Sequence, residues 1–397
     1  MDNIVPVPKG FSFAAHNAGF RYQGRDDVAL MVSDRPAAGA GVFTRNLFQA
    51  APVLVAKDNL KKSEKIRAFL VNAGQANACT GEQGKANCKE TLKLAAERLG
   101  LTPAEILPAS TGVIGPQLKM DIWKDQMPAL TAKLGQSSPL DAAKAIMTTD
   151  AFPKMAWGTV EIGGREIRLL GMAKGAGMIC PNMATMLSFV VCDAEVDKAR
   201  WQGMLAAAVD GSFNAVTVDG DTSTNDCVLA MANGASGVKV HSDEELAALA
   251  AALNEVCQAL AYMVVEDAEG GTKIIRVSVT GAEDNMQAEA CARAVGHSPL
   301  VKTAMFGRDA NWGRIVAAVG RSGADFKPEN VCVSIGGIPV FLNGQPVEGD
   351  LDSLLAPHMR RSEIAVDIDL GAGNGEYLLL AADLTYEYVK INGDYRS

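Results

Sequence analysis

The sequence predicts an α/β protein in which helices cover mixed β-sheets. Short apolar runs bounded by turn residues are typical of buried strands, and the first three are Val28–Ser33, Pro52–Ala56 and Arg67–Asn72. Segments with helical periodicity lie between such runs, and short glycine turns join other runs as hairpins. Because hairpins connect some of the strands, we expect mixed sheets in layers with helices, not a strict array of β-α-β units.

Capping signals and periodicity locate the helices. A capping box places a hydroxyl residue before the helix and an acidic residue three positions later, and proline favours the first helical position. The predicted helices are Ala86–Leu99 before Gly100, a helix started by Thr102-Pro103-Ala104-Glu105, one started by Ser138-Pro139, and an Ala/Leu-rich one from Ser242 and Glu245 to about Met263.

Glycine turns and apolar runs locate the remaining strands. The predicted segments are a hairpin of Thr159–Ile162 and Arg165–Leu170 around Gly163-Gly164, a central strand at Met186–Cys192, and Glu363–Leu370 joined through Gly371–Gly375 to a strand over Tyr377–Ile391.

Length and composition bound the function. The 397 residues correspond to two or three domains, or to one large domain with an appendage, and a net charge of −9 disfavours binding to nucleic acid or anionic membranes. No run of 18 apolar residues occurs, so no membrane-spanning helix is expected, and the N-terminus lacks the pattern of a signal peptide. We therefore expect a cytoplasmic protein whose eight cysteines are small buried hydrophobes rather than disulfides.

Three motifs resemble functional sites but fit them poorly. Gly371–Gly375 precedes a strand rather than a helix, which disfavours a dinucleotide loop. Asp219–Asp226 lacks the glycine and the final acid of a calcium loop and predicts a turn stabilised by its side chains. The four histidines lie far apart, with no metal-helix spacing. We expect neither a metal nor a cofactor.

The segment Lys174–Val191 is the unusual one. A loop rich in glycine and proline runs into an apolar strand, with Thr185 at the junction. Thr185 is either a residue that simply begins the strand or a nucleophile that attacks the carbonyl before it. In the second case, chain cleavage would leave the Thr185 α-amine, whose pKa is near 8, as a general base beside its hydroxyl.

A second glycine-rich element is Ser110–Gly115. A hydroxyl next to a glycine amide, as at Thr111 and Gly112, provides two donors for a tetrahedral oxyanion. The same pattern is also typical of a simple turn beside a strand.

The whole chain resembles the ArgJ family, the glutamate N-acetyltransferases (ornithine acetyltransferases) of the cyclic arginine pathway. The resemblance rests on many landmarks in order rather than on any single motif. They are Ser33–Pro36, Gly41–Thr44, Val71–Gly81, Ser110–Gly115, Thr148–Asp150 with Phe152–Lys154, Lys174–Leu187, Val218–Asp226, Ser298–Ala304 and Asn311–Arg314.

The resemblance implies roles for individual residues. Self-cleavage between Ala184 and Thr185 would give an α chain of residues 1–184 and a β chain of residues 185–397. Thr185 would be the nucleophile that carries the acetyl group, with Thr111 and Gly112 as the oxyanion hole. The implied substrate contacts are Thr148, Lys174, Thr185, Glu269, Asn392 and Ser397.

Charge chemistry fits two of these roles. Lys174 can pair with a substrate carboxylate, and Glu269 can accept an NH group. The sequence departs from the family pattern at Ala268 and Gly271, where we expect glycine and alanine, and at Cys180 and Ser397. These departures affect pocket contacts more than the chemistry.

The resemblance also implies the architecture. The implied fold is a DmpA/ArgJ-like layered sandwich with two facing mixed sheets flanked by helices, and the implied processing is that of N-terminal-nucleophile enzymes. We expect a main domain over about residues 1–280, a smaller α/β domain over about 281–370, and a tail over about 371–397 that returns to the active site. The two chains would assemble as an α2β2 heterotetramer.

The implied reaction moves acetyl from N2-acetyl-L-ornithine to L-glutamate by a ping-pong mechanism. Three alternatives remain: a bifunctional enzyme that also uses acetyl-CoA, an amidohydrolase or aminopeptidase with the same nucleophile, and a non-catalytic metabolite-binding protein. Formation of N-acetylglutamate from acetyl-CoA, release of free acetate, and the absence of an acetyl adduct would distinguish them.

Overall fold

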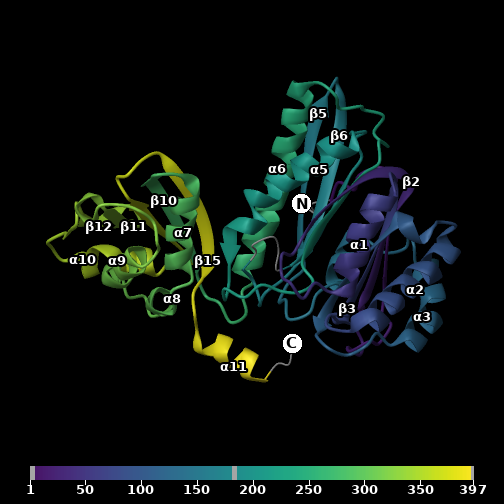
Figure 1. Cartoon of the computed structure of the whole chain (residues 1–397), viewed down its shortest axis with the longest axis horizontal. Coiled ribbons are helices and arrows are strands. Elements are labelled where there is room, and N and C mark those ends of the chain that lie inside the picture. Colours follow the sequence, from purple (N-terminus) through teal and green to yellow (C-terminus); the bar gives the residue numbers. More distant parts are fainter. Residues whose placement is uncertain (1–4, 181–185, 395–397) are drawn as a thin grey trace. The chain divides into compact units, whose positions relative to one another are not determined.

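The computed structural model describes residues 5–180 and 186–394 and confirms an α/β fold with two mixed sheets flanked by helices (Figure 1). The chain divides into two compact units. Among the described residues, the first unit contains residues 5–180, 186–214 and 222–264, and the second contains residues 215–221 and 265–394.

The first unit is built on an eight-stranded sheet. In order across it, the strands are β4 (Ile106–Val113), β3 (Ile66–Gln75), β2 (Val28–Phe43), β9 (Cys227–Ala232), β7 (Leu187–Cys192), β6 (Arg165–Lys174) and β5 (Lys154–Ile162), and β1 (Phe11–His16) pairs with β2. Its helices are α1 (Ala51–Lys62), α2 (Gly81–Leu99), α3 (Met120–Ala132), α4 (Pro139–Ala145), α5 (Lys198–Asp210) and α6 (Asp243–Glu266), with 3-10 turns at Pro103–Glu105 and Phe213–Ala215.

Both faces of this sheet are buried, because successive residues of β3 belong alternately to two different apolar clusters. Phe69 and Val71 belong to one apolar cluster, which includes residues of α4. Ala68 and Leu70 belong to another, which includes residues of α2 and α3. Successive strand residues point to opposite faces, so a run that is apolar throughout is typical of a strand covered on both sides.

The second unit has a seven-stranded sheet. Its strands, in order, are β13 (Gln345–Pro346), β12 (Ile338–Leu342), β11 (Cys332–Ile335), β14 (Glu363–Asp369), β10 (Ile274–Ala282), β15 (Gly375–Ala382) and β8 (Val216–Thr217). Its helices are α7 (Asn285–Gly296), α8 (Pro299–Phe306), α9 (Trp312–Gly320), α10 (Leu351–Met359) and α11 (Tyr386–Asp394), with a 3-10 turn at Pro328–Asn330.

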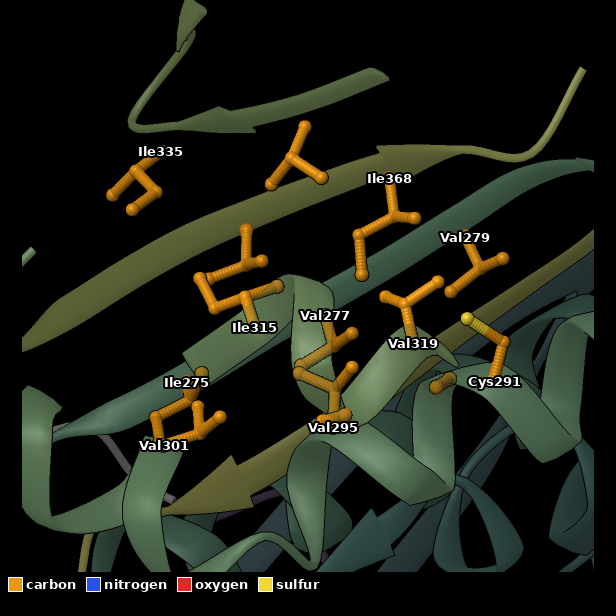
Figure 2. Close-up of a cluster of buried hydrophobic side chains, with 14 of the residues drawn as sticks. Ile275, Val277, Val279, Cys291, Val295, Val301, Ile315, Val319, Ile335 and Ile368 are labelled. Carbon is orange, nitrogen blue, oxygen red and sulfur yellow. The ribbon is translucent and has the colours of Figure 1, made fainter. Parts of the chain in front are cut away.

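The core of the second unit lies between the sheet and its helices. Figure 2 shows Ile275, Val277 and Val279 of β10 beside Cys291 and Val295 of α7. Every second residue of β10 contributes, as the period of a strand with one core-facing side requires.

Several local predictions are confirmed. The β5–β6 hairpin turns through Gly163 and Gly164, which have φ values of 59° and 72°, as a type I′ turn needs. Strand β7 lies inside the sheet between β9 and β6. Ser242 and Glu245 form the capping box of α6, because the Glu245 N–H donates to Ser242 Oγ (3.2 Å) and the Ser242 N–H donates to Glu245 Oε2 (3.1 Å).

Two strand predictions are wrong. Pro52–Ala56 lies in α1, where Pro52 occupies the first helical turn. The strand predicted over Tyr377–Ile391 ends at Ala382 and gives way to α11. The Thr385 hydroxyl accepts the Tyr388 N–H (3.1 Å) near the start of that helix. In addition, the capping box at Thr102 starts only a three-residue 3-10 turn.

The domain boundary falls earlier than residue 280. Strand β10 pairs with β14 and β15, so the second unit takes up the chain from Val265. Strand β15, expected to begin the tail, lies inside this sheet between β10 and β8.

Helix α6 alone, within the described part of the chain, has the length and composition of a membrane-spanning helix, although the sequence predicted none. It has 24 residues and a mean hydropathy of 1.5 over 18 of them, half of which are buried. A Cβ at Gly171 of β6 would lie 2.7 Å from Leu260 Cδ1 and 2.8 Å from Val256 Cγ1. The apolar face of α6 therefore packs closely on the sheet, as that of a core helix does.

Candidate active site

Thr111 and Gly112 lie at the carboxyl end of β4, beside the end of β3. The two strands are parallel, with Gly74 of β3 opposite Gly112. The side-chain amide of Asn225 donates to the carbonyls of Ser110 (2.8 Å) and Ala76 (2.6 Å). Asn225 is buried, so one amide fixes the separation of the two strand ends next to the half-buried Thr111.

The backbone at Gly112 admits no side chain. Its φ is +126°, and a Cβ there would lie 2.3 Å from the carbonyl carbon of Gly74 and 2.6 Å from the Gly74 Cα. Glycine is therefore required both for the dihedral angle and for the approach of the two backbones.

We expect Gly112→Ala to lower the free energy of unfolding by about 3 kcal/mol, since it adds a steric clash to an unfavourable dihedral angle. Gly115→Ala is the matched control, because Gly115 also has a positive φ (+107°) but no heavy atom within 4 Å of the added Cβ. Gly115→Ala is expected to lower the free energy of unfolding by only about 1 kcal/mol. Thermal and urea unfolding measure both values, and equal losses would contradict the close approach at Gly112.

Lys174 lies at the end of β6 and is 8% exposed. Its Nζ donates to Thr111 Oγ1 at 3.4 Å and is 4.0 Å from Asp150 Oδ2. Lys174 pairs with Leu187, the first residue of β7. Lys174 and Thr111 therefore meet although they are 63 positions apart in the sequence. The strand that carries Lys174, β6, pairs with β7, the strand that follows Thr185 in the sequence.

Asp150 joins the segments that carry Thr148 and Lys174, and sequence reasoning gave it no role. Its Oδ2 accepts the Thr148 N–H (2.9 Å), and its Oδ1 accepts the Gly175 N–H (2.6 Å) and the Lys154 ammonium (2.8 Å). Burial raises the pKa of Asp150, but the charges of Lys174 and Lys154 and these hydrogen bonds outweigh it and lower the pKa to about 2. The only sequence signal for this residue was its place among the landmarks.

In the second unit, Glu269 and Asn392 lie together. The Asn392 side-chain amide donates to Glu269 Oε2 (2.8 Å), although the two residues are 123 positions apart. Helix α11 approaches the turn after Glu269 closely, because a Cβ at Gly270 would lie 2.6 Å from the Tyr388 nitrogen. The Thr385 hydroxyl also donates to the Gly270 carbonyl (2.7 Å). The segment expected to be a returning tail therefore packs on the Glu269 turn as a helix.

The predicted site residues thus fall into two described groups. Thr111, Gly112, Thr148 and Lys174 form one in the first unit, where Lys174 contacts Thr111 and Asp150 lies between Lys174 and the Thr148 N–H. Glu269 and Asn392 form the other in the second unit. Ala184, Thr185 and Ser397 lie outside the described residues.

The calcium-like motif Asp219–Asp226 is a turn held by its own side chains, as predicted. Asp219 Oδ1 accepts the Asp221 N–H (3.3 Å), and Ser223 Oγ accepts the Asn225 N–H (3.2 Å). Over residues 5–180 and 186–394, no group of three His, Cys, Asp or Glu side chains is arranged to bind a metal ion.

Comparison with known proteins covers almost the whole chain. The ArgJ family model matches residues 12–397. The arginine biosynthesis bifunctional protein ArgJ of Nitratidesulfovibrio vulgaris is 60% identical over 390 residues, which are 98% of this chain and 99% of that protein. The protein of the same name from Geobacter sulfurreducens is 47% identical over 391 residues, with coverage of 98% and 99%.

A solved structure is also similar. The crystal structure of arginine biosynthesis bifunctional protein ArgJ from Bacillus halodurans is 40% identical, with a TM-score of 0.51. The match covers 53% of this chain and 100% of that chain. The landmarks, the α/β fold and near-complete coverage at high identity agree, and the chain therefore belongs to the ArgJ family of arginine-biosynthesis enzymes.

Proposed function

We propose that this protein cuts itself before Thr185 and then transfers acetyl from N2-acetyl-L-ornithine to L-glutamate, producing L-ornithine and N-acetyl-L-glutamate. The observation that carries the proposal is the 3.4 Å contact between the Lys174 ammonium and the Thr111 hydroxyl. This contact supports the proposal, because an ammonium suited to an amino-acid carboxylate lies beside a hydroxyl suited to donate to an acyl oxyanion. The relatives' role in arginine biosynthesis supports the same small-molecule substrates.

The reaction has two half-reactions at one nucleophile. Thr185 Oγ attacks the acetyl carbonyl while the Thr185 α-amine takes the hydroxyl proton. Thr111 and the Gly112 amide donate to the oxyanion, and its collapse expels ornithine, whose nitrogen receives that proton. The glutamate amine then attacks the acetyl ester and regenerates the free hydroxyl.

One pocket must hold both amino acids, so recognition should concentrate on what they share. Both have an α-carboxylate, which Lys174 would bind, and an α-nitrogen that bears or receives the acetyl group. Glu269 is 9% exposed and held by Asn392, so it offers a fixed carboxylate to a substrate NH group. Water must be excluded from the acetyl ester, because otherwise the enzyme would be a hydrolase.

Self-cleavage has support from chain lengths. The solved Bacillus chain is matched in full by 53% of this one, and 0.53 × 397 is about 210 residues. A cut before Thr185 would leave a fragment of 397 − 184 = 213 residues. A fragment of that size therefore agrees with the length of the solved relative.

Mass spectrometry tests the proposal directly. After brief incubation with N2-acetyl-L-ornithine alone, we expect one added acetyl group on the fragment that starts at Thr185, lost again when L-glutamate is supplied. Without the acceptor the ester persists, because water is excluded from it. An acetyl group on another residue would reassign the nucleophile, and steady release of acetate would identify a hydrolase.

A second activity, formation of N-acetylglutamate from acetyl-CoA, is favoured by the relatives' description as bifunctional. An assay with acetyl-CoA and glutamate in the absence of acetylornithine measures it. We also propose that the working form is a cytoplasmic α2β2 assembly, which size-exclusion chromatography with light scattering would report as 2 × 41.7 = 83.4 kDa.

A further inference from the structure

The proposed mechanism leaves unused a buried ion pair beside the site. Lys154 is 0% exposed, and its Nζ donates to Asp150 Oδ1 at 2.8 Å. Asp150 and Lys154 belong to the landmarks Thr148–Asp150 and Phe152–Lys154, and the proposed reaction gives neither of the two a chemical role. Burying two charges is costly, and such a pair is weak evidence for stability alone, which raises the question of what it does.

The pair lies next to the one cation that the proposed reaction needs. Lys174 Nζ is 4.0 Å from Asp150 Oδ2, beyond hydrogen-bond distance, whereas Lys154, Gly175 and Thr148 all donate to Asp150 within 2.9 Å. Asp150 is therefore occupied by other donors and holds Lys174 nearby without binding it closely.

Lys154 determines the net charge of the group formed by Asp150, Lys154 and Lys174. Lys154 and Asp150 cancel, which leaves the group of three with a net charge of +1 on Lys174. Without Lys154, Asp150 and Lys174 would cancel each other, and Lys174 would have a buried carboxylate as its partner. Because both groups are buried, the Asp150 carboxylate would then compete strongly with a substrate carboxylate for the Lys174 ammonium.

We propose that Lys154 is a positioning residue that neutralises Asp150 and so keeps the Lys174 ammonium available for the α-carboxylate of the substrate. This inference rests on the proposed function. Lys154 acts through Asp150 and Lys174, and its effect is on recognition of the carboxylate, not on the acetyl chemistry.

The test compares two variants with two substrates. In Lys154→Met, we expect KM for N2-acetyl-L-ornithine to rise about tenfold or more, the scale of a lost interaction with a charged group. KM for the α-carboxamide of the same compound, which has no charge for Lys174 to bind, should change less than threefold. In Asp150→Asn/Lys154→Met, the group of three again has a net charge of +1, carried by Lys174. The ratio of KM for the carboxamide to KM for the carboxylate should therefore return to within about threefold of the wild-type ratio.

The outcomes separate the inference from the proposed function. A wild type that transfers no acetyl refutes the function. A wild type that does transfer it, together with a Lys154→Met variant whose KM rises equally for both substrates, refutes the inference and leaves a structural role. Thermal unfolding checks each variant. If Lys154→Met does not fold, the double variant Asp150→Asn/Lys154→Met decides the question alone. If it prefers the carboxylate substrate over the carboxamide as the wild type does, the inference is supported. If it has lost that preference, the inference is refuted.

Discussion

Thr185→Ala is expected to run as one 41.7-kDa chain on a denaturing gel and to transfer no acetyl group, whereas we expect the wild type to separate into fragments of 184 and 213 residues. The substitution removes the oxygen that, in the proposed mechanism, both cuts the chain and carries the acetyl group. Intact-mass measurement gives the cleavage position to the residue, and a coupled assay of ornithine release gives the activity.

Two variants control this experiment. Thr159→Ala removes the hydroxyl of an exposed threonine in β5 and should be cut and active like the wild type. Thr185→Ser keeps a hydroxyl and should still be cut, though at a different rate. An unbroken wild type with full activity, or a Thr185→Ala variant that still transfers acetyl, would rule out Thr185 as the nucleophile.

Thr111→Val is expected to lower kcat about 100- to 1000-fold with little change in KM, the effect of removing one oxyanion donor. Valine keeps the shape of threonine and its preference for a strand, so the end of β4 should remain in place. An oxyanion donor, the role that we propose for Thr111, acts on charge that develops only in the transition state, and for that reason the loss should appear in kcat.

Ser110→Ala is the matched control for Thr111→Val. The Ser110 hydroxyl is buried and donates to Asn72 Oδ1 at 2.7 Å, so its loss should lower stability and leave kcat within a few-fold. Single-turnover kinetics of acetyl-enzyme formation separate the chemical step from product release. Equal kcat values for the two variants would refute an oxyanion role for Thr111.

Local sequence patterns predicted much of the fold. The β5–β6 hairpin follows from Gly163-Gly164, and the buried strand β7 follows from its continuous apolar run. The errors occurred where a short window is ambiguous. Five apolar residues at Pro52–Ala56 fit a buried strand as well as the first turns of α1.

Tertiary contacts determine where the last strand, β15, ends. After β15, the buried Asp383 side chain accepts the N–H groups of Thr272 (2.8 Å) and Lys273 (3.2 Å) and the Thr272 hydroxyl (2.6 Å). These partners lie 110 or more positions away in the sequence. The Thr385 hydroxyl gives a local capping signal for the start of α11, but the contacts of Asp383, which hold the end of the strand, come from distant residues.

For the candidate site, the sequence by itself determined the residue types, their order and the family, because the landmarks are local and can be recognised one at a time. Only the tertiary structure decided which of them meet: Lys174 with Thr111 and Asp150, and Asn392 with Glu269. The physical reason is that strand pairing and helix packing bring together residues from distant parts of the chain. The lowered pKa of Asp150 depends in part on Lys174, which lies 24 positions away in the sequence, and not on the nearby Lys154 alone.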